Sequence, residues 1–257
     1  MIHLFALLSL LLCGVCYTGF QNSSHFHNTG NRRSLLLLVF GGALLLRLLL
    51  AYTTHGFSND IACFAAWADR IFTLGPGQFY SAEMFTDYPP GFMYVLYLIG
   101  ALRSLLQIPY YSDLHILLLK LPAILCDIAC GFLLYREAVK RLHFSDLQGI
   151  FAASAYLFQP AVILNSSCWG QVDSVYTLMI ILMCLFLMKG NLLPAYAVYG
   201  LGVLLKPQML IFTPVLLAGI WDHVFLQDFS WRKFFYNLCG GLVVICGMLL
   251  LCCLLYT

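Results

Sequence analysis

Long apolar runs separated by short polar segments make up most of this chain. The apolar runs cover residues 1–20, 34–52, 91–106, 114–135, 147–164, 175–188, 192–221 and 234–256. Several of them approach the length of about 20 residues that an α-helix needs to cross a bilayer. They are rich in Leu and Ile and do not alternate with polar residues, as the strands of a membrane barrel would. The pattern predicts an all-α, polytopic transmembrane helix bundle.

The composition excludes an ordinary soluble protein, because 62% of the residues are hydrophobic and only 9% are charged. The net charge of +2 is too small to indicate a nucleic-acid partner. Most of the eleven cysteines lie inside apolar runs, where Cys acts as a small hydrophobic residue. Cys13 and Cys16 form a C-x-x-C pair without a basic neighbour that would activate a thiol. No metal-ligand spacing is present, so we expect no cofactor, while dependence on a divalent metal stays open.

One polar stretch, residues 53–90, interrupts the apolar pattern for longer than any other segment. It follows an apolar run of membrane length directly and leads into another apolar run. Together with the next polar loop it carries the acidic residues Asp60, Asp69, Glu83, Asp87 and Asp113. Polar side chains gathered where the chain leaves the bilayer indicate an active site at the membrane face.

The two ends of the chain stand apart from this pattern. Residues 1–20 lack a basic segment and a clear cleavage site, so they form either an additional membrane helix or a signal peptide. With the polar linker that follows, residues 1–33 are expected to precede a transmembrane domain of residues 34–257, whose catalytic outer loop covers residues 53–113. The sequence ends at Thr257 without a polar tail, which suggests the front part of a longer protein.

The basic residues predict the orientation. Placing Arg32 and Arg33 on the cytoplasmic side puts residues 53–90 on the outer side. Three later basic clusters are then cytoplasmic only if residues 91–106 make no net crossing. They are Arg136 with Lys140 and Arg141, then Lys189, and then Arg232 with Lys233. That run is short, contains Arg103 and follows a diproline, so we expect a juxtamembrane or re-entrant helix. If it spans the bilayer, the positive-inside pattern fails three times.

With this choice, residues 147–164 run outward and deliver the segment NSSCWGQVD (165–173), which contains WGQVD (169–173), to the outer face. The apolar run 192–221 is too long for one simple span, and Lys206–Pro207 interrupts it, because a proline inside a helix removes a backbone hydrogen bond. We expect two short half-spans that meet at KPQ (206–208). Broken helices at membrane depth are tolerated where they line a polar cavity. The acidic loop, WGQVD and KPQ are therefore expected on one side.

Two acidic residues of the outer loop are candidates for chemistry. Asp60 follows Ser58–Asn59, which can cap an amphipathic helix, so its carboxylate either complements the helix dipole or serves as a general base. Asp87 and Tyr88 precede a diproline, which holds the preceding backbone extended. They form either a structural turn or a fixed carboxylate and tyrosine beside the site.

Other candidates lie in the later segments. Trp169, Gln171 and Asp173 can shape a sugar site, although Trp is also common at bilayer interfaces. Lys206 and Gln208 are candidates for contact with a phosphate, since a lysine at membrane depth is costly without a role. Asp127, inside an apolar run, is expected to be structural with Lys120 as a distant partner. Asp69 and Arg70 are expected to be solvated or to form a local ion pair.

Several motifs together resemble the GT-C superfamily of membrane glycosyltransferases. They are HGFSND (55–60), Trp67, DYPPG (87–91), WGQVDS (169–174) and LKPQ (205–208). In order and combination they resemble most closely bacterial proteins similar to the GPI mannosyltransferase II family, and more distantly the dolichyl-linked glucosyltransferases. The match covers roughly residues 34–221. Each motif alone is weak, whereas the ordered set is fairly specific.

The resemblance implies an inverting transferase that moves a mannose-like sugar from a polyprenyl phosphate to a glycan, lipid or protein acceptor. It implies that Asp60 is the catalytic base. It places the site on the outer face of a bacterial plasma membrane, or on the luminal face of the endoplasmic reticulum in a eukaryote. Family members lack the first helix and are commonly longer, so a chain without their later helices would lack part of its pocket and be inactive.

Two other functions compete with this one. A secondary transporter also has broken helices and intramembrane Lys and Asp, although the sequence shows no inverted repeat. A non-catalytic membrane scaffold is the third alternative. Activity towards a lipid-phosphate sugar would separate the three.

Overall fold

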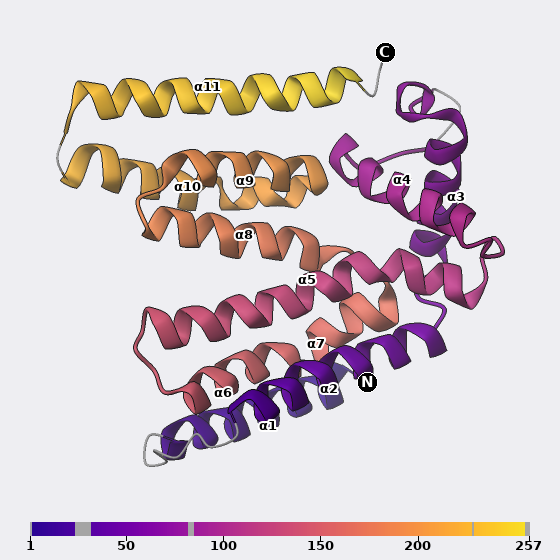
Figure 1. The fold of residues 1–257 in the computed structure, drawn as a ribbon, viewed down its shortest axis with the longest axis horizontal. Helices are drawn as coiled ribbons and strands as arrows, with labels where there is room; N and C mark the ends of the chain where they lie inside the picture. Colours follow the sequence, from indigo (N-terminus) through magenta and orange to yellow (C-terminus); the bar gives the residue numbers. More distant parts are fainter. Residues whose placement is uncertain (1, 24–31, 82–84, 228, 255–257) are drawn as a thin grey trace. The chain divides into compact units, whose positions relative to one another are not determined.

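The computed structural model describes residues 2–23, 32–81, 85–227 and 229–254. These residues form helices and turns and contain no β-strand, which confirms the all-α prediction (Figure 1). Four helices are long and apolar enough to cross a membrane: Arg32–Thr53, Asp113–Lys140, Pro207–Leu226 and Trp231–Cys253. The pair Asp146–Leu157 and Pro160–Trp169, bent by 51°, makes a fifth if it is one span. Glu83 and most of the expected linker 21–33 lie outside the described residues.

The helices occur in the following order. They are α1 (Ile2–Ser23), α2 (Arg32–Thr53), α3 (Ser58–Leu74), η1 (Pro76–Gln78), α4 (Pro90–Leu105), α5 (Asp113–Lys140), α6 (Asp146–Leu157), α7 (Pro160–Ile163), η2 (Leu164–Trp169), α8 (Asp173–Met188), α9 (Leu192–Leu205), η3 (Pro207–Phe212), α10 (Thr213–Trp221), η4 (Asp222–Gln227) and α11 (Trp231–Leu254). They divide into two compact units. Unit 1 is Met1–Ile61 with Tyr111–Ser174, and unit 2 is Ala62–Tyr110 with Val175–Thr257.

This division differs from the expected one. Residues 1–33 were expected to precede a single domain of residues 34–257, whereas α1 packs against α6 inside unit 1. A close approach at Gly19 makes this packing tight, because a Cβ there would lie 2.5 Å from the Phe151 ring. Small residues of this kind allow membrane helices to pack by van der Waals contact.

In unit 1, α2 and α5 run antiparallel. At one end, Arg32 Nε lies 3.1 Å from Asp146 Oδ1. At the other end, His55 Nδ1 lies 3.6 Å from Asp113 Oδ1. The segment between His55 and Asp113, which holds α3 and α4, therefore begins and ends at the same end of unit 1. That return is the arrangement that the positive-inside pattern requires.

The segment α6–α7–η2 runs the length of unit 1 with a break in the middle. Ser145 and Gln148 form a capping box that starts α6 beside Arg32. Pro160 takes the first position of α7, where its missing N–H costs no hydrogen bond. The end of η2 returns to the His55 end, because Phe57 N donates to Trp169 O at 2.9 Å.

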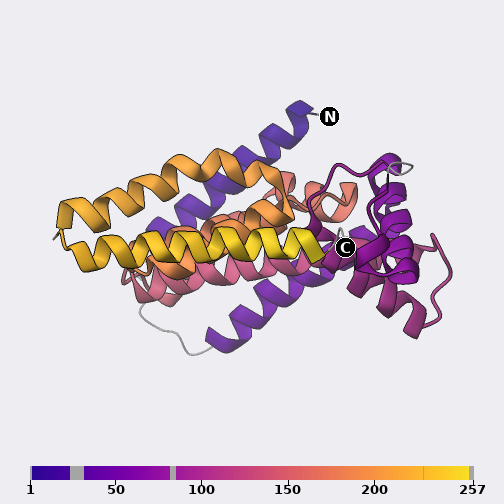
Figure 2. The same cartoon turned by 90° about the horizontal axis from the view of Figure 1, so that it is seen from above.

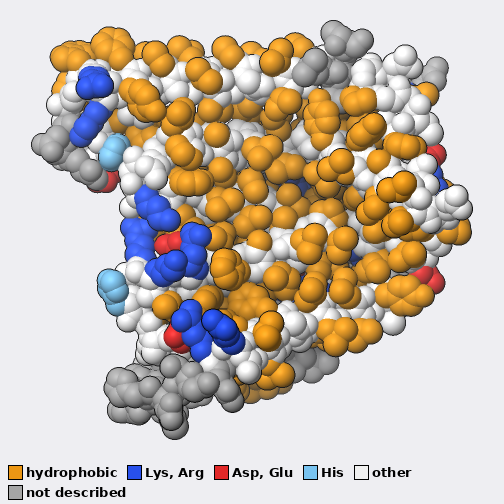
Figure 3. Space-filling view, viewed as in Figure 1, with side chains coloured by type: hydrophobic (Ala, Val, Ile, Leu, Met, Phe, Trp, Pro, Cys, Tyr) orange, Lys and Arg blue, Asp and Glu red, His pale blue; other side chains and the backbone are white. Residues whose placement is uncertain are grey.

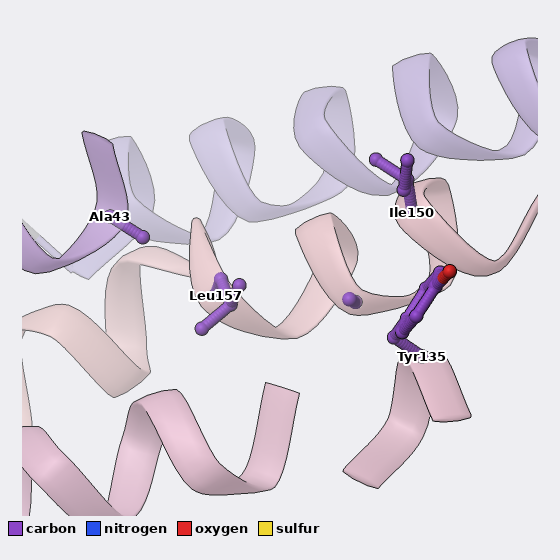
Figure 4. Packing of buried hydrophobic residues seen from close by; sticks show 5 residues of the cluster. Ala43, Tyr135, Ile150 and Leu157 are labelled. Carbon is purple, nitrogen blue, oxygen red and sulfur yellow. The ribbon is translucent and has the colours of Figure 1, made fainter. Parts of the chain in front are cut away.

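The core of unit 1 lies between α2, α5 and α6. Its buried members are Ala43, Tyr135, Ile150, Ala153 and Leu157 (Figure 4). Gly131 lets α5 approach α6, since a Cβ there would lie 2.6 Å from the Leu157 side chain. Other apolar residues of these helices, among them Leu37, Leu125 and Phe132, are exposed.

Unit 2 contains the predicted break at Lys206–Pro207. Lys206 is extended (φ −154°, ψ 124°) and ends α9. The chain then reverses, so that the segment after Pro207 runs back along α9. Two close approaches show this: a Cβ at Gly202 would lie 2.9 Å from Met209, and one at Gly190 would lie 2.8 Å from His223. The second arm, Pro207–Leu226, is of membrane length rather than a short half-span. Pro207 occupies a first helical turn and thus starts a helix as well as ending one.

The helix α11 packs along this hairpin and runs parallel to α9 (Figure 2). A Cβ at Gly240 would meet Leu193 at 2.9 Å, and one at Gly200 would meet Met248 at 2.8 Å. Within unit 2, α3 and α4 also pack closely. At Gly100 they approach so closely that a Cβ would lie 2.5 Å from Ala68 O.

Asp69 and Arg70, which were expected to be solvated or to form a local ion pair, do not pair with each other. The Asp69 carboxylate pairs with Arg103 of α4. The Arg70 guanidinium instead donates to Phe79 O at 2.9 Å and to Ser81 Oγ at 3.1 Å. Adjacent positions on a helix point in different directions, so partners on other segments are in better reach.

Candidate functional site

Asp60 lies in the first turn of α3, close to the end of η2 in unit 1. Gly56 makes the turn that brings the two segments together. It has a φ of +79°, and a Cβ there would lie 2.7 Å from Trp169 O. Glycine is favoured at this position for both reasons. The neighbouring bond from Phe57 N to Trp169 O fixes the start of α3 against the WGQVD segment.

The Asp60 carboxylate is held by two neutral donors. Trp169 Nε1 donates to Asp60 Oδ2 at 3.2 Å, and Gln171 Nε2 donates to the same oxygen. Asp60 is partly buried, and Trp169 is 50% exposed. Among the described residues, none donates to the other oxygen, Oδ1. The carboxylate is therefore oriented through one oxygen, while the second is available to a ligand.

The Trp169 ring packs against Phe57, with centroids 5.1 Å apart and planes inclined by 30°. Half of its surface remains exposed. The indole thus has three roles available: it packs on Phe57, donates to Asp60, and offers a flat face to a ligand. Aromatic side chains with an exposed face and a polar edge suit amphipathic ligands.

Asp173 is placed by a different partner. Asn165 Nδ2 donates to Asp173 Oδ2 at 2.8 Å. The Asn165 carbonyl accepts from the backbone N–H groups of Gly170 and Gln171 at 3.1 and 3.0 Å. Gly170 is in the left-handed region (φ 87°, ψ 22°), which ends η2. Asn165, which was not among the predicted site residues, therefore links the shape of this turn to Asp173.

Lys120 is buried beneath the Asp60 segment. Its Nζ donates to Thr54 O at 2.7 Å, to Thr54 Oγ1 at 3.1 Å and to Ala51 O at 3.2 Å. The last carbonyls of a helix lack hydrogen-bond donors within the helix, and Lys120 donates to such carbonyls at the end of α2. The suggested pairing of Lys120 with Asp127 is therefore wrong, since the ammonium group is used at the end of α2.

Asp127 forms the centre of a buried network in the middle of unit 1. Arg47 Nε donates to its Oδ2 at 3.1 Å, Ser166 Oγ to the same oxygen at 2.6 Å, and Tyr156 OH to Oδ1 at 3.2 Å. Arg47, Asp127 and Ser166 are completely buried. The expectation of a structural Asp127 is consistent with this network, but its partner Arg47 was missed. A single arginine inside an apolar helix was the signal available in the sequence.

Arg47 also stabilises the break in the α6–α7–η2 segment. Its Nη2 donates to Leu157 O at 2.7 Å, at the end of α6. This carbonyl lies just before Pro160, where the helix cannot continue its hydrogen bonds. The network therefore joins α2, α5 and the broken segment, whose last residue is Trp169.

In unit 2, Lys206 and Tyr88 come together. Lys206 is 8% exposed, and its Nζ lies 5.7 Å from the ring centroids of both Tyr88 and Tyr176. Such distances are typical of cation–π contacts. Tyr88 packs in a cluster of rings, with centroids 5.4 Å from Phe64 and 5.3 Å from Phe92. The Tyr-Pro-Pro segment thus carries a rigid aromatic group beside the lysine.

The remaining candidates are not joined to these groups. Asp87 and Gln208 are exposed. Neither side chain has a hydrogen bond or ion pair within the part of the chain that the structure describes. The structure therefore assembles Asp60 with Trp169 and Gln171 in unit 1, and Tyr88 with Lys206 in unit 2. A single site made of all the predicted residues stays a prediction.

The described residues contain no cluster of three or more His, Cys, Asp or Glu side chains that could hold a metal ion. The carboxylate of Asp60 has an indole and an amide as partners rather than other metal ligands.

No model of a known protein family matches the chain. A comparison with curated proteins likewise finds no match. The resemblance to GT-C glycosyltransferases therefore rests on the ordered motifs alone.

Proposed function

We propose that this protein is a GT-C-type membrane glycosyltransferase that moves a mannose-like sugar from a polyprenyl phosphate to an acceptor hydroxyl. The observation that carries the proposal is the Asp60 carboxylate, which is oriented through Oδ2 by Trp169 and Gln171. It lies where a helix of membrane length, α2, has just ended. A general base needs this combination of a fixed position and access to the substrate proton.

In the proposed reaction, Asp60 Oδ1 accepts the proton of the acceptor hydroxyl. The hydroxyl oxygen forms a bond to the anomeric carbon of the donor sugar as the bond from that carbon to the phosphate oxygen breaks. The polyprenyl phosphate leaves with the bonding electron pair, and the configuration at the anomeric carbon is inverted. The donors on Oδ2 restrict rotation of the carboxylate, which favours a productive geometry.

Two further roles belong to the same proposal. The exposed face of Trp169 stacks on a sugar ring, and Gln171 and Asp173 hydrogen-bond its hydroxyls. Lys206, buried against Tyr88 and Tyr176, balances the charge of the lipid phosphate. A lysine at membrane depth is costly, so a function for its charge is expected.

We further propose that the Asp60 end of unit 1 faces the extracytoplasmic side. The opposite end of unit 1 carries the basic residues Arg32, Arg33, Lys140 and Arg141, with Arg32 paired to Asp146. Basic residues at the ends of membrane helices are enriched on the cytoplasmic side. A lipid-linked donor would then reach the protein from the bilayer, and the acceptor from water.

The test uses the full chain reconstituted in vesicles with a polyprenyl phosphate carrying radiolabelled mannose, in parallel with the glucose form. Octyl mannoside serves as the acceptor, and transfer to it is measured. Asp60→Asn keeps the shape of the side chain but removes the base, so transfer should fall by about 10²- to 10⁴-fold.

Asp113→Asn is the matched control, because Asp113 is an exposed carboxylate at the same end of unit 1. It should keep the wild-type rate. Wild-type transfer by Asp60→Asn would remove Asp60 from its role. Movement of the labelled sugar across the membrane without transfer by the wild type would favour a transporter instead.

A further inference from the structure

A second polar site lies in unit 2, at the turn between η4 and α11. It is a cavity of about 470 Å³, within the range of roughly 300–1,000 Å³ that small-molecule sites occupy. Its polar lining consists of His223, Ser230, Arg232, Lys233, Tyr236 and Asn237. None of these residues takes part in the proposed transfer reaction.

The lining predicts an anionic ligand. It contains Arg232, Lys233 and His223 and no Asp or Glu among the described residues. Asp222, next to His223, is exposed and does not line the cavity. Arg and Lys are the side chains that most often bind phosphate oxygens through charge-assisted hydrogen bonds. Figure 3 shows Lys or Arg side chains at the end of unit 2 where η4 leads into α11, with a histidine and an acidic side chain beside them.

A second cavity adjoins the first and is apolar. It has a volume of about 260 Å³ and lies between α11 and the α10–η4 segment. Its lining includes Ile220, Val224, Leu238, Leu242 and Ile245. Asn237, which is buried, lines both cavities. A charged compartment thus shares a lining residue with an apolar one, and this pair suits a molecule with a phosphate at one end and a hydrocarbon chain at the other.

The surroundings place this pair of cavities at the surface of a bilayer. A series of aromatic rings follows the turn, with centroids 4.7 Å apart for Trp221 and Phe225, and 5.2 Å apart for Phe229 and Trp231. Trp221 and Trp231 are 58% and 67% exposed. Exposed Trp residues are enriched at the level of lipid headgroups. The apolar helix α11 then leads away from the turn. Only 6% of its membrane-length segment is buried.

We propose that these two cavities bind an anionic diacyl phospholipid, with its phosphate between Arg232, Lys233 and His223 and one acyl chain in the apolar cavity. The quaternary ammonium group of a zwitterionic lipid would bring a positive charge towards three basic side chains, so phosphatidylcholine should bind less well. A soluble phosphate would use the polar cavity alone and leave the apolar one empty.

The test titrates the full chain in detergent micelles with phosphatidylglycerol, and native mass spectrometry measures the bound lipid. Phosphatidylcholine and inorganic phosphate are titrated in parallel. Each basic residue near an anionic headgroup contributes about fivefold in affinity, so Arg232→Gln with Lys233→Gln should weaken phosphatidylglycerol binding by roughly 25-fold. Arg232→Lys with Lys233→Arg keeps the charge and should bind within a fewfold of the wild type.

The matched control is Arg33→Gln with Lys140→Gln, which removes the same charge from exposed positions of unit 1. It should change binding by less than twofold. Equal loss in this control, equal binding of phosphatidylcholine, or wild-type binding by the Gln pair would each overturn the site. Displacement of the lipid by millimolar inorganic phosphate would show a soluble anion to be the ligand and overturn the phospholipid assignment.

Discussion

Two aspartates of unit 1 lie in contrasting surroundings. Asp127 is completely buried and accepts hydrogen bonds from Arg47, Ser166 and Tyr156 at both oxygens. Asp60 is partly buried and accepts bonds from Trp169 and Gln171 at one oxygen only. The first carboxylate has a cationic partner, whereas the second has only neutral ones.

The difference separates a structural carboxylate from one suited to catalysis. The Arg47 guanidinium at 3.1 Å gives Asp127 a cationic partner, and hydrogen bonds reach both carboxylate oxygens. Such a group is costly to disturb. Neutral donors orient Asp60 through Oδ2 and, among the described residues, leave Oδ1 without a donor, as the proposed role of a general base requires.

The largest expected effect is on stability, from breaking the buried pair. Arg47→Met leaves Asp127 buried without its cation and removes the donor to Leu157 O. Loss of one partner of a buried pair typically costs about 3–5 kcal/mol in the free energy of unfolding. Unfolding of the reconstituted protein in mixed micelles of increasing SDS content measures this cost. Asp60→Asn, by contrast, should change stability by less than about 0.5 kcal/mol.

The double change Arg47→Met with Asp127→Leu tests the cause. It removes both charges, so it should recover most of the stability lost in Arg47→Met, because apolar replacements of buried pairs are often neutral. If the double variant is less stable than Arg47→Met, the side-chain shapes rather than the unpaired charge determine the loss.

A smaller effect is expected at Lys120, which lies between the two aspartates along unit 1. Lys120→Met keeps the aliphatic stem but leaves the acceptors of Thr54 and Ala51 without their donor. Unsatisfied buried acceptors cost about 1–3 kcal/mol in the free energy of unfolding. The same SDS titration measures the change. Lys140→Met, at an exposed position of the same helix, is the control and should leave stability unchanged.

The contrast between the aspartates also shows what the sequence could predict. The apolar runs located most helices, and Pro207 located the reversal in unit 2, because both signals are local in the chain. The pairing of Arg47 with Asp127 joins residues 80 positions apart. The sequence contains both charged residues but no local feature that specifies which helix faces which.

The same holds for the site residues: local motifs predict single candidates, but not which residues pair with them. Local motifs singled out Asp60 and Trp169 as separate candidates, and the structure adds that Gln171, 111 positions from Asp60, donates to its carboxylate. Asn165 was not predicted as a site residue, because an Asn at the end of an apolar run indicates only where a membrane segment ends. Its bond to Asp173 depends on the left-handed turn at Gly170, which only the folded chain reveals.

The smallest effect is expected from removing one donor to Asp60. Trp169→Phe keeps a ring against Phe57 but removes the N–H that donates to Oδ2. Gln171 still holds the same oxygen, so the carboxylate should lose orientation only in part. At an exposed site, one hydrogen bond contributes about 0.5–1.5 kcal/mol, which corresponds to a fall in transfer of roughly 2- to 12-fold. Initial rates of mannose transfer by the reconstituted protein measure it. Trp169→Ala, which also removes the sugar-stacking face, should lose more, and equal rates for the Phe and Ala variants would assign the effect to the indole N–H alone.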